Sequence, residues 1–295
     1  MKLSRTLALI AAALLIGLGA TSCNDKNNNE EFKVQQKITT ALAHVSDING
    51  TEASITYKGL SYDIIYDYIA ATAEVTIQGL RVPGGTQYPA VKLSEVPFKV
   101  EKDGTRLLEG TNLPSAISGF ASAPLFTSFR LSVFDRIIGE YYYPVASISF
   151  TIDGRYHGVS TIPTQVFQGT TVTTDANGQS FSNTDPIYVL ELDVQKMTAS
   201  LTINGAKFVQ QMPAQTMSFT EIPFTISDNG VVTIEKSGEI IPTIGNTPYP
   251  SFPITGFKAV FTIGTGMNLD FVCSVKGEPY TVNAQLPFNY KAQQQ

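Results

Sequence analysis

Apolar and polar residues alternate, or apolar residues come in short runs, along the first half of the chain. In residues 72–80, Ala73, Val75 and Ile77 would point to one face of a strand and the intervening residues to the other. Turn-forming residues recur about every 8 to 12 positions, which is typical of antiparallel all-β units. The pattern predicts strands and no helix. The expected strands of this half are residues 38–45, 53–58, 62–68, 72–80, 91–100, 105–109, 128–134, 147–152 and 156–162.

The second half of the chain repeats this pattern. Residues 62–104 align without a gap on residues 188–230, and 11 of the 43 aligned positions are identical. Outside this stretch, the sequence DING from Asp47 recurs as DANG from Asp175, and Asn-Gly is a strong signal for a tight hairpin turn. Both halves are therefore expected to begin with the same hairpin.

These observations predict an all-β protein of two tandem homologous antiparallel β units, residues 32–163 and residues 164–290. About eight or nine strands per unit can close as a small barrel or stack as a sandwich, since both show the same alternation. Hydrophobic residues make up 43% of the 295 residues, which suffices for a core in each unit. No proline- or serine-rich linker follows Pro163, so we expect the units to pack closely.

Residues 1–22 have the pattern of a secretion signal. Lys2 and Arg5 precede an unbroken run of apolar and small residues at positions 7–20. A retained transmembrane helix would need about 20 apolar residues and different flanking residues. We therefore expect this segment to be removed from the mature protein.

The signal ends in the sequence ATSC at positions 20–23, which resembles the lipobox of bacterial lipoproteins. This resemblance implies that Cys23 is acylated and becomes the mature N-terminus, held to a membrane by its acyl chains. Ala20 stands where the commonest lipobox has leucine, and the Ser-Cys ending is similar to the Bacteroidetes variant. The alternative is ordinary cleavage after Ala20, which would leave Cys23 with a free thiol.

Residues 23–31 are polar and end in two glutamates, as expected of a lipidated tether. Their character is similar to that of the acidic export signals of surface-exposed Bacteroidetes lipoproteins, which implies an outer-membrane location, at the cell surface in preference to the periplasmic side. Unit size, strand spacing and the lipobox together resemble Bacteroidetes-type outer-membrane lipoproteins of uncharacterised function with calycin-like domains. That resemblance implies small β-barrels.

Charge and motif content restrict the partners and cofactors. Without Lys2 and Arg5 the chain keeps 18 of its 20 basic residues against 25 acidic ones, a net charge of −7. This charge argues against nucleic acid and anionic lipid surfaces as partners. The sequence has no zinc-binding His or Cys motif, no serine-hydrolase elbow and no phosphate-binding loop. We expect no metal, no cofactor and no disulfide, with Cys273 as a core residue.

Carboxylates are the remaining candidates for catalysis. Asp67 and Asp193 occupy equivalent positions in the repeat, as do Glu95 and Glu221. Because each occurs once per copy beside a strand or turn, we expect them to maintain the fold, with a β-bulge or edge at each Glu-x-Pro sequence. The carboxylates considered for a hydrolase are Glu95, Asp135 and Glu140.

Aromatic residues supply the candidate binding sites. At least one of three consecutive tyrosines in a strand must face away from the core, where its ring and hydroxyl can contact a peptide, protein or sugar. This run and two loops rich in Pro, Gly and Ser, residues 112–127 and 243–256, differ most between the copies. The candidate contact residues are Tyr141, Tyr142, Tyr143, Phe120, Phe126, Tyr249 and Phe252.

The sequence therefore predicts a non-catalytic, membrane-anchored lipoprotein that acts as a binding or cell-surface assembly module. A cell-surface protein or glycan is the expected partner, and the absence of tryptophan disfavours the glycan. Two alternatives stay open: a carrier of a small apolar ligand within a β-barrel, and a carboxylate-dependent hydrolase. The carrier requires an internal cavity, and the hydrolase requires two carboxylates about 5 to 10 Å apart.

Overall fold

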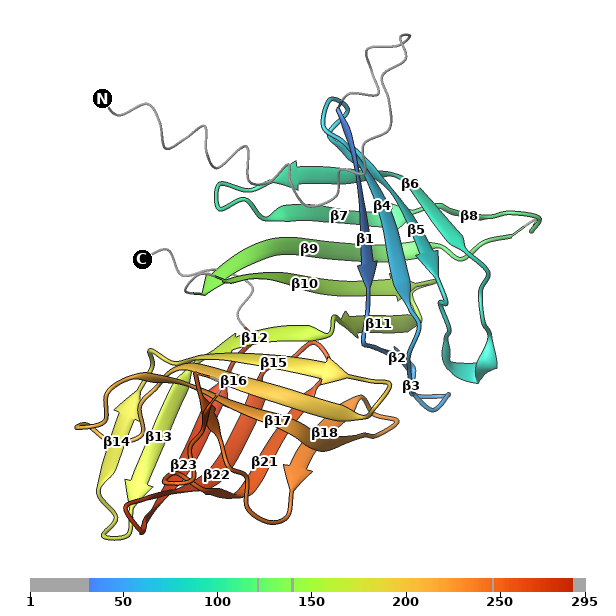
Figure 1. Cartoon of the computed structure of the whole chain (residues 1–295). Coiled ribbons are helices and arrows are strands. Elements are labelled where there is room, and N and C mark those ends of the chain that lie inside the picture. Colours follow the sequence, from blue (N-terminus) through green and yellow to red (C-terminus); the bar gives the residue numbers. More distant parts are fainter. Residues whose placement is uncertain (1–31, 121, 139–140, 246, 289–295) are drawn as a thin grey trace, which may run out of the picture.

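The computed structural model describes residues 32–120, 122–138, 141–245 and 247–288, and within these ranges the fold is all-β (Figure 1). The one helical segment in these ranges is the short 3-10 turn η1 (Pro83–Gly85). No described segment is a helix with the length and hydropathy of a membrane span. The signal sequence, Cys23, the tether and Glu140 lie outside the described residues. The prediction of tandem antiparallel β units is confirmed.

Eleven strands form the first sheet, in the order β1-β4-β5-β6-β7-β9-β10-β11-β2-β3, with β8 paired to β6 beside this path. Their bounds are β1 (Lys33–Thr39), β2 (Leu42–Asp47), β3 (Ile55–Tyr57), β4 (Ser61–Asp67), β5 (Thr72–Gln78), β6 (Val91–Val100), β7 (Arg106–Leu113), β8 (Ser115–Ile117), β9 (Phe126–Ile138), β10 (Tyr141–Ile152) and β11 (Tyr156–Thr161).

Twelve strands form the second sheet, in the order β12-β15-β16-β17-β18-β21-β22-β23-β13-β14, with β19 and β20 attached beside β17. Their bounds are β12 (Thr164–Gln168), β13 (Thr170–Asp175), β14 (Ser180–Asn183), β15 (Ile187–Asp193), β16 (Thr198–Ala206), β17 (Gln215–Ile226), β18 (Val231–Lys236), β19 (Thr243–Ile244), β20 (Thr247–Pro248), β21 (Ile254–Thr262), β22 (Met267–Val275) and β23 (Glu278–Leu286).

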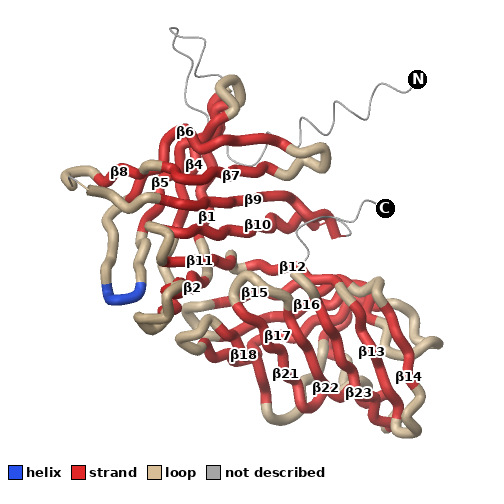
Figure 2. Tube along the Cα trace, turned by 180° about the vertical axis from the view of Figure 1, so that it is seen from behind, coloured by secondary structure: helices blue, strands red, loops and turns tan. Residues whose placement is uncertain are grey.

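The first two strands of each unit follow one another through a bend, and together they join the two ends of the sheet. β1 pairs with β4 near one end of the order, and β2, two residues later, pairs with β11 near the other. At the bend, the Thr40 N–H donates to the Leu60 carbonyl (3.1 Å) and the Ala41 N–H donates to the Thr161 carbonyl (2.7 Å). In the second unit, β12 pairs with β15 and β13 with β23, on either side of Gly169. Each unit is therefore a curled, barrel-like sheet (Figure 2).

Large side chains fill the interior of both sheets. In the first unit, the buried Phe126 ring lies 6.2 Å from Phe129 and 6.0 Å from Phe150, between ring centroids. The hydroxyl of the fully buried Tyr62 forms a hydrogen bond with Ser160 Oγ at 3.1 Å. The aromatic residues packed in the core of the second unit include Phe208, Phe219, Phe257 and Phe271.

The repeat is visible in the backbone as well as in the sequence. Ala71 and Met197 have φ values of 53° and 56°, and Glu95 and Glu221 have φ values of 57° and 56°. The strand register shifts beside both glutamates, which confirms the predicted bulge. Residues other than glycine rarely adopt positive φ. These shared positions therefore mark a backbone requirement common to the two copies.

The repeated aspartates also maintain the fold. Asp67 Oδ1 accepts the backbone N–H groups of Ile69 (3.0 Å) and Ala70 (2.9 Å) in the turn after β4. Asp193 Oδ1 makes the same two bonds after β15, to Gln195 (3.1 Å) and Lys196 (3.0 Å). Short-range bonds of this kind are the usual reason for aspartate in a turn.

The two units contact each other through an apolar cluster and a polar turn. Phe134 and Val145 of the first unit pack against Val166 and Val189 of the second. Residues 227–230, which we call the docking turn, lie between β17 and β18 and contact β3 of the first unit. The hydroxyls of Ser54 and Thr56 both donate to the Asp228 carbonyl at 3.1 Å.

Asp47 ties the start of the first unit to its end. Its carboxylate accepts hydrogen bonds from the backbone N–H groups of Asn49 (3.0 Å) and Thr51 (3.2 Å), and from Arg155 Nε (3.3 Å) and Nη2 (3.0 Å). Arg155 Nη2 also lies 2.8 Å from Glu52 Oε1. The bond to Arg155, supported by Thr51 and Asn49, holds the pKa of Asp47 well below its usual range. The ionised form of Asp47 therefore stabilises the folded protein.

We expect Asp47→Asn to lower the free energy of unfolding at neutral pH, because the amide carries no charge to pair with Arg155. Ionised Asp47 stabilises the fold above the unfolded-state pKa of about 3.9, and this contribution is lost as the pH falls toward the depressed folded-state pKa. The difference between wild type and variant should therefore shrink in acid. Urea titrations at about pH 7 and about pH 3 measure it.

The matched control for this experiment is Asp175→Asn. Asp175 accepts the backbone N–H groups of Asn177 (2.9 Å) and Gln179 (2.8 Å), and it forms no ion pair within the described part of the chain. Its substitution should lower stability less at neutral pH. Equal losses for the two variants would contradict a stabilising role for the Asp47–Arg155 pair.

Candidate functional site

The hairpin of β9 and β10 is longer than its counterpart in the second unit. β9 and β10 contain 13 and 12 residues, whereas β21 and β22 contain nine each. On the added length, Phe134 and Ile138 point outward and are covered by Val166 and Val189 of the second unit. We call residues 134–138 and 141–145 the extended hairpin. It joins the two units and has no equivalent in the second copy.

The extended hairpin exposes an apolar pair of side chains. Tyr142 lies directly opposite Ile137 across the two strands, and the two residues are 61% and 57% exposed. Directly opposed residues in antiparallel strands have Cβ atoms about 5 Å apart, so the two side chains form one continuous surface. Ile137 was not among the residues selected from the sequence. Its position opposite the tyrosine run across a short hairpin is the signal that identifies it.

The remaining tyrosines of the run have other surroundings. Tyr143 is partly buried and packs against the apolar cluster between the units. The backbone of Tyr141 pairs with Ile138, while its side chain lies outside what the structure describes. Tyr142 is therefore the tyrosine of this run that faces solvent beside Ile137.

Arg136 fixes the extended hairpin to the second unit. Its Nη2 donates a hydrogen bond to Gln168 Oε1 at 2.6 Å, and the residue is only 7% exposed. Burial lowers the pKa of Arg136, and its buried Nη1 has no hydrogen-bond partner among the described residues. The guanidinium thus lies within the contact between the units and forms no solvent-facing site.

The two loops rich in Pro, Gly and Ser occupy equivalent places in the two units. β8 pairs with β6 at Val91, and β19 pairs with β17 at Met217, which is the repeat position of Val91. In the first loop Phe120 is 61% exposed, and in the second Tyr249 is 40% exposed. Phe252 is partly buried against the core, with its ring centroid 5.1 Å from that of Tyr249.

Phe126 requires a correction to the interpretation of the first loop. It belongs to β9 and is fully buried against Phe129 and Phe150, so it has no surface to offer a ligand. The exposed Phe120 precedes the start of β9, whereas Tyr142 lies beside its end. A strand of this length spans about 40 Å. Phe120 and Tyr142 therefore do not form one site.

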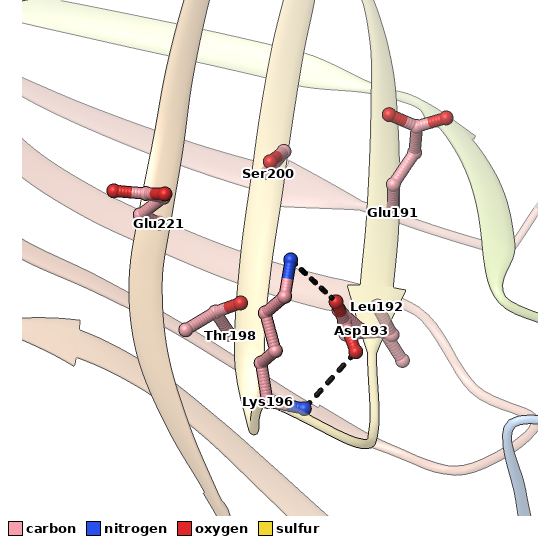
Figure 3. Close-up of a pocket in the computed structure, with 7 residues that line it drawn as sticks. All are labelled: Glu191, Leu192, Asp193, Lys196, Thr198, Ser200 and Glu221. Atoms are coloured by element: carbon pink, nitrogen blue, oxygen red, sulfur yellow. Dashed lines mark hydrogen bonds and ion pairs between the residues drawn. The ribbon is translucent and has the colours of Figure 1, made fainter.

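Carboxylates gather in one open hollow on the second unit, with a volume of about 620 Å³ (Figure 3). Glu191 lies on β15 and Glu221 on β17, with β16 between them. Asp193 is engaged by the backbone and side chain of Lys196, and the backbone N–H of Lys196 is the main cause of its lowered pKa. A general acid needs a raised pKa. Asp193 is therefore unsuited to that role, and its bonds are those of a turn.

The other candidates for chemistry have structural surroundings. Cys273 is buried in β22, as predicted, and burial raises the pKa of its thiol to about 12. Asp135 and Glu95 are exposed on separate strands. The described residues contain no group of three or more His, Cys, Asp or Glu side chains able to hold a metal ion.

A small hollow of about 210 Å³ lies between the units, lined by residues that include Ser149 and Val159 of the first and Gln165 and Phe288 of the second. Typical small-molecule sites have volumes of about 300 to 1,000 Å³. The hollow is thus smaller than such a site.

No protein-family model and no curated protein sequence matches the chain. A protein of Bacteroides fragilis NCTC 9343 with the provisional name outer membrane protein is similar over 90% of this chain and 100% of its own, with 14% identity and a TM-score of 0.35. Transferrin binding protein B of Neisseria meningitidis serogroup B is similar over 87% and 77%, with 10% identity and a TM-score of 0.24. The same-named protein of Haemophilus parasuis Hp5 is similar over 87% and 76%, with 6% identity and a TM-score of 0.24. At these TM-scores the similarities assign no function to this chain.

Proposed function

We propose that this protein is an outer-membrane lipoprotein, anchored through Cys23, that binds another cell-surface protein without catalysis. The lipobox and the polar tether of residues 23–31 support the anchoring. The exposed pair Ile137 and Tyr142 supports the binding role. Exposed apolar side chains that lie side by side are typical of protein contact sites.

The observation that carries the proposal is the placement of this pair on the extended hairpin. One face of the hairpin is held by the second unit through Phe134 and Arg136, so the opposite face, which carries Ile137 and Tyr142, is presented on a supported strand pair. Tyrosine is enriched in protein interfaces because it buries a large ring and still offers a hydroxyl. Isoleucine offers neither a stacking face nor a hydrogen bond to a sugar, which favours a protein over a glycan.

The two alternatives have less support in the described residues. The interior of each sheet is packed with aromatic side chains, and the two hollows described above lie outside the sheets. A carrier of an apolar ligand would need space in one of these interiors. A hydrolase would need a carboxylic acid with a raised pKa beside a second carboxylate. In the carboxylate-lined hollow of the second unit, the bonds to Lys196 instead favour the charged form of Asp193.

The binding role is tested by placing a photo-crosslinking residue at Tyr142 or Ile137 in intact cells. We expect both positions to give the same crosslinked envelope protein, because their side chains form one surface. Phe120 and Tyr249 are matched control positions, since both are exposed aromatic residues on loops away from the hairpin. Crosslinks from the controls alone, or from neither hairpin position, would contradict the proposal. Crosslinks to glycan would show that the partner class is different.

The anchoring is tested separately by mass spectrometry of the mature N-terminal peptide. We expect three acyl chains on Cys23 and no residue before it. The Cys23→Ser variant should leave the membrane fraction, because each buried methylene of the lost acyl chains contributes about 0.8 kcal/mol to membrane binding. Cleavage after Ala20 with an unmodified cysteine would contradict anchoring. Protease digestion of intact cells then distinguishes a cell-surface location from a periplasmic one.

A further inference from the structure

One end of the first unit carries a concentration of exposed apolar side chains. Thirteen large apolar side chains are exposed among the described residues, and six of them lie where β1 begins and around the neighbouring turns. We call these six the apolar tip: Phe32, Val34, Ile65, Tyr68, Ile69 and Val100, with exposures between 37% and 63%.

Strand pairing brings Phe32, Val34 and Tyr68 together on one face. The Tyr68 N–H donates to the Phe32 carbonyl at 3.2 Å, and Val34 follows Phe32 on β1. The ring of Tyr68 meets Phe98 edge-on, with ring centroids 5.1 Å apart. Val100 lies two residues after Phe98 on β6, on the same face of the strand. The start of β1, the turn after β4 and the end of β6 thus form one apolar surface, and Ile65 lies beside it on the other face of β4, opposite Gln35.

The apolar tip stands on an ordered base. Beneath it, Tyr66 and Phe98 are buried with ring centroids 4.8 Å apart, and the Tyr66 hydroxyl donates to Gln36 Oε1 at 2.8 Å. Asp67 fixes the turn that presents Ile69, as described above. The exposed side chains therefore extend from paired strands and a hydrogen-bonded turn.

The second copy shows that this fold does not require exposed apolar residues at these positions. At the repeat positions of Ile65 and Ile69 it carries Glu191 and Gln195, yet the turn and its aspartate are the same. At those of Tyr68 and Val100 it carries Val194 and Ile226, which are partly buried against its core. Glu191 lines the hollow shown in Figure 3, and Gln195 lies in the turn after β15, where its backbone N–H bonds to Asp193. The apolar residues of the first copy therefore need an explanation other than strand pairing.

The length of the tether limits how far the apolar tip can lie from an anchor at Cys23. Phe32 is nine residues after Cys23, and nine residues span about 30 Å when fully extended. An anchor at Cys23 would hold the apolar tip within that distance of the bilayer. Tethering raises the effective concentration of the second contact, so even weak membrane affinity would suffice for docking.

We propose that the apolar tip docks on the lipid surface that holds Cys23, with Tyr68, Ile69 and their neighbours at the boundary between headgroups and acyl chains. This inference rests on the proposed anchoring. Tyrosine and aliphatic side chains partition to that boundary, and their burial needs no attraction between charges. The net charge of −7 expected for the mature chain fits this apolar mode of contact. Docking orients the first unit with this end toward the bilayer.

The protein contains no tryptophan, so one introduced residue reports on one place. The test uses Ile69→Trp in the chain from Cys23 onward, which retains every described residue. Cys23 is coupled to a maleimide lipid in zwitterionic vesicles, because the other cysteine, Cys273, is buried. This coupling supplies the tether whether or not cells acylate Cys23. A failure of docking is therefore distinguishable from a failure of anchoring.

We expect the Ile69→Trp emission to shift to the blue on tethering and to be quenched by brominated acyl chains. Ile48→Trp is the control, since Ile48 is 57% exposed in the hairpin turn after β2, away from the apolar tip, and its emission should not change. Unchanged emission of Ile69→Trp would overturn the proposal. A blue shift without vesicles that grows with protein concentration would assign the apolar tip to contact between copies, and would also overturn it.

A second measurement keeps the proposal testable without tryptophan. The double variant Ile65→Glu and Ile69→Gln carries the residues of the second copy, so we expect it to fold. On tethered wild type, vesicles should slow hydrogen exchange in the turn after β4, and the double variant should lose this protection. Equal protection in both proteins would overturn docking through the apolar tip.

Discussion

Replacing Gly169 by alanine is expected to destabilise the second unit by about 3 kcal/mol, at the upper end of the usual cost of overpacking. Gly169 is the bend between β12 and β13. A Cβ there would lie 2.1 Å from the carbonyl oxygen of Gln285 and 2.7 Å from Pro287 Cδ. The carbonyl belongs to β23, which pairs with β13, so no side-chain rotation relieves the contact. The closing strand would have to move away from one of its partners.

Ala41→Gly is the matched control, because Ala41 lies at the equivalent bend of the first unit. Its side chain is buried beside the core of the second unit, and its N–H donates to the Thr161 carbonyl of its own unit. Removing one methyl group and adding backbone freedom should destabilise the folded protein by only about 1 kcal/mol. Urea unfolding followed by hydrogen exchange in each unit separates the two effects. Similar losses for Gly169→Ala and Ala41→Gly would show that the bend in the second unit does not depend on close backbone approach.

The features that sequence comparison predicted are those that depend on local chemistry. Asp67 and Asp193 cap turns through their own neighbours, and Glu95 and Glu221 mark bulges beside proline. Such bonds link residues only a few positions apart. Both members of each bond therefore lie within the 43 aligned positions and recur in both copies. The alternation of apolar residues likewise predicted the strands because each strand has one face toward a packed interior.

The closure of each sheet could not be predicted, because it depends on two neighbouring residues bonding to strands far apart in sequence. Thr40 bonds to Leu60 and Ala41 bonds to Thr161, and neither bond changes the alternation of apolar residues. The contact between the units could not be predicted from the sequence, for the same reason. Phe134 faces outward from its own sheet and is buried only because the second unit covers it.

The candidate site likewise combines features that could be predicted from the sequence with features that could not. The tyrosine run was recognisable as a place where the copies differ, but the partner of Tyr142 across the hairpin, Ile137, depends on strand register. Phe126 was selected because it ends a loop rich in small residues, yet it begins β9 and packs in the core. Exposure of an aromatic residue at a loop boundary is set by where the strand starts, which propensity locates only within a few residues.

Gly230→Ala is expected to loosen the contact between the units, whereas Gly104→Ala at the repeat position should leave it intact. Both glycines have positive φ, 73° and 84°, so alanine strains either backbone by about 1 kcal/mol. At Gly104 a Cβ would meet nothing within 4 Å. At Gly230 it would lie 2.7 Å from Cγ and 2.9 Å from Nδ1 of His44, which belongs to β2 of the first unit.

The clash at Gly230 falls where the docking turn meets the first unit. His44 Nδ1 lies 3.1 Å from Thr56 Oγ1, and that hydroxyl donates to the Asp228 carbonyl. Displacing the imidazole or the docking turn would therefore break the polar contact as well. Small-angle scattering should show a larger radius of gyration for Gly230→Ala than for Gly104→Ala, and hydrogen exchange should accelerate in β3.

Rescue by a second substitution separates this contact from backbone strain. In the double variant His44→Ala with Gly230→Ala, the imidazole that meets the new Cβ is absent, so the units should return to the wild-type radius of gyration. The strain of about 1 kcal/mol from positive φ would remain, because it belongs to the turn itself. If the double variant stays expanded, the effect of Gly230→Ala arises within the docking turn and not from His44. If Gly104→Ala expands the protein equally, close approach at Gly230 does not position the units.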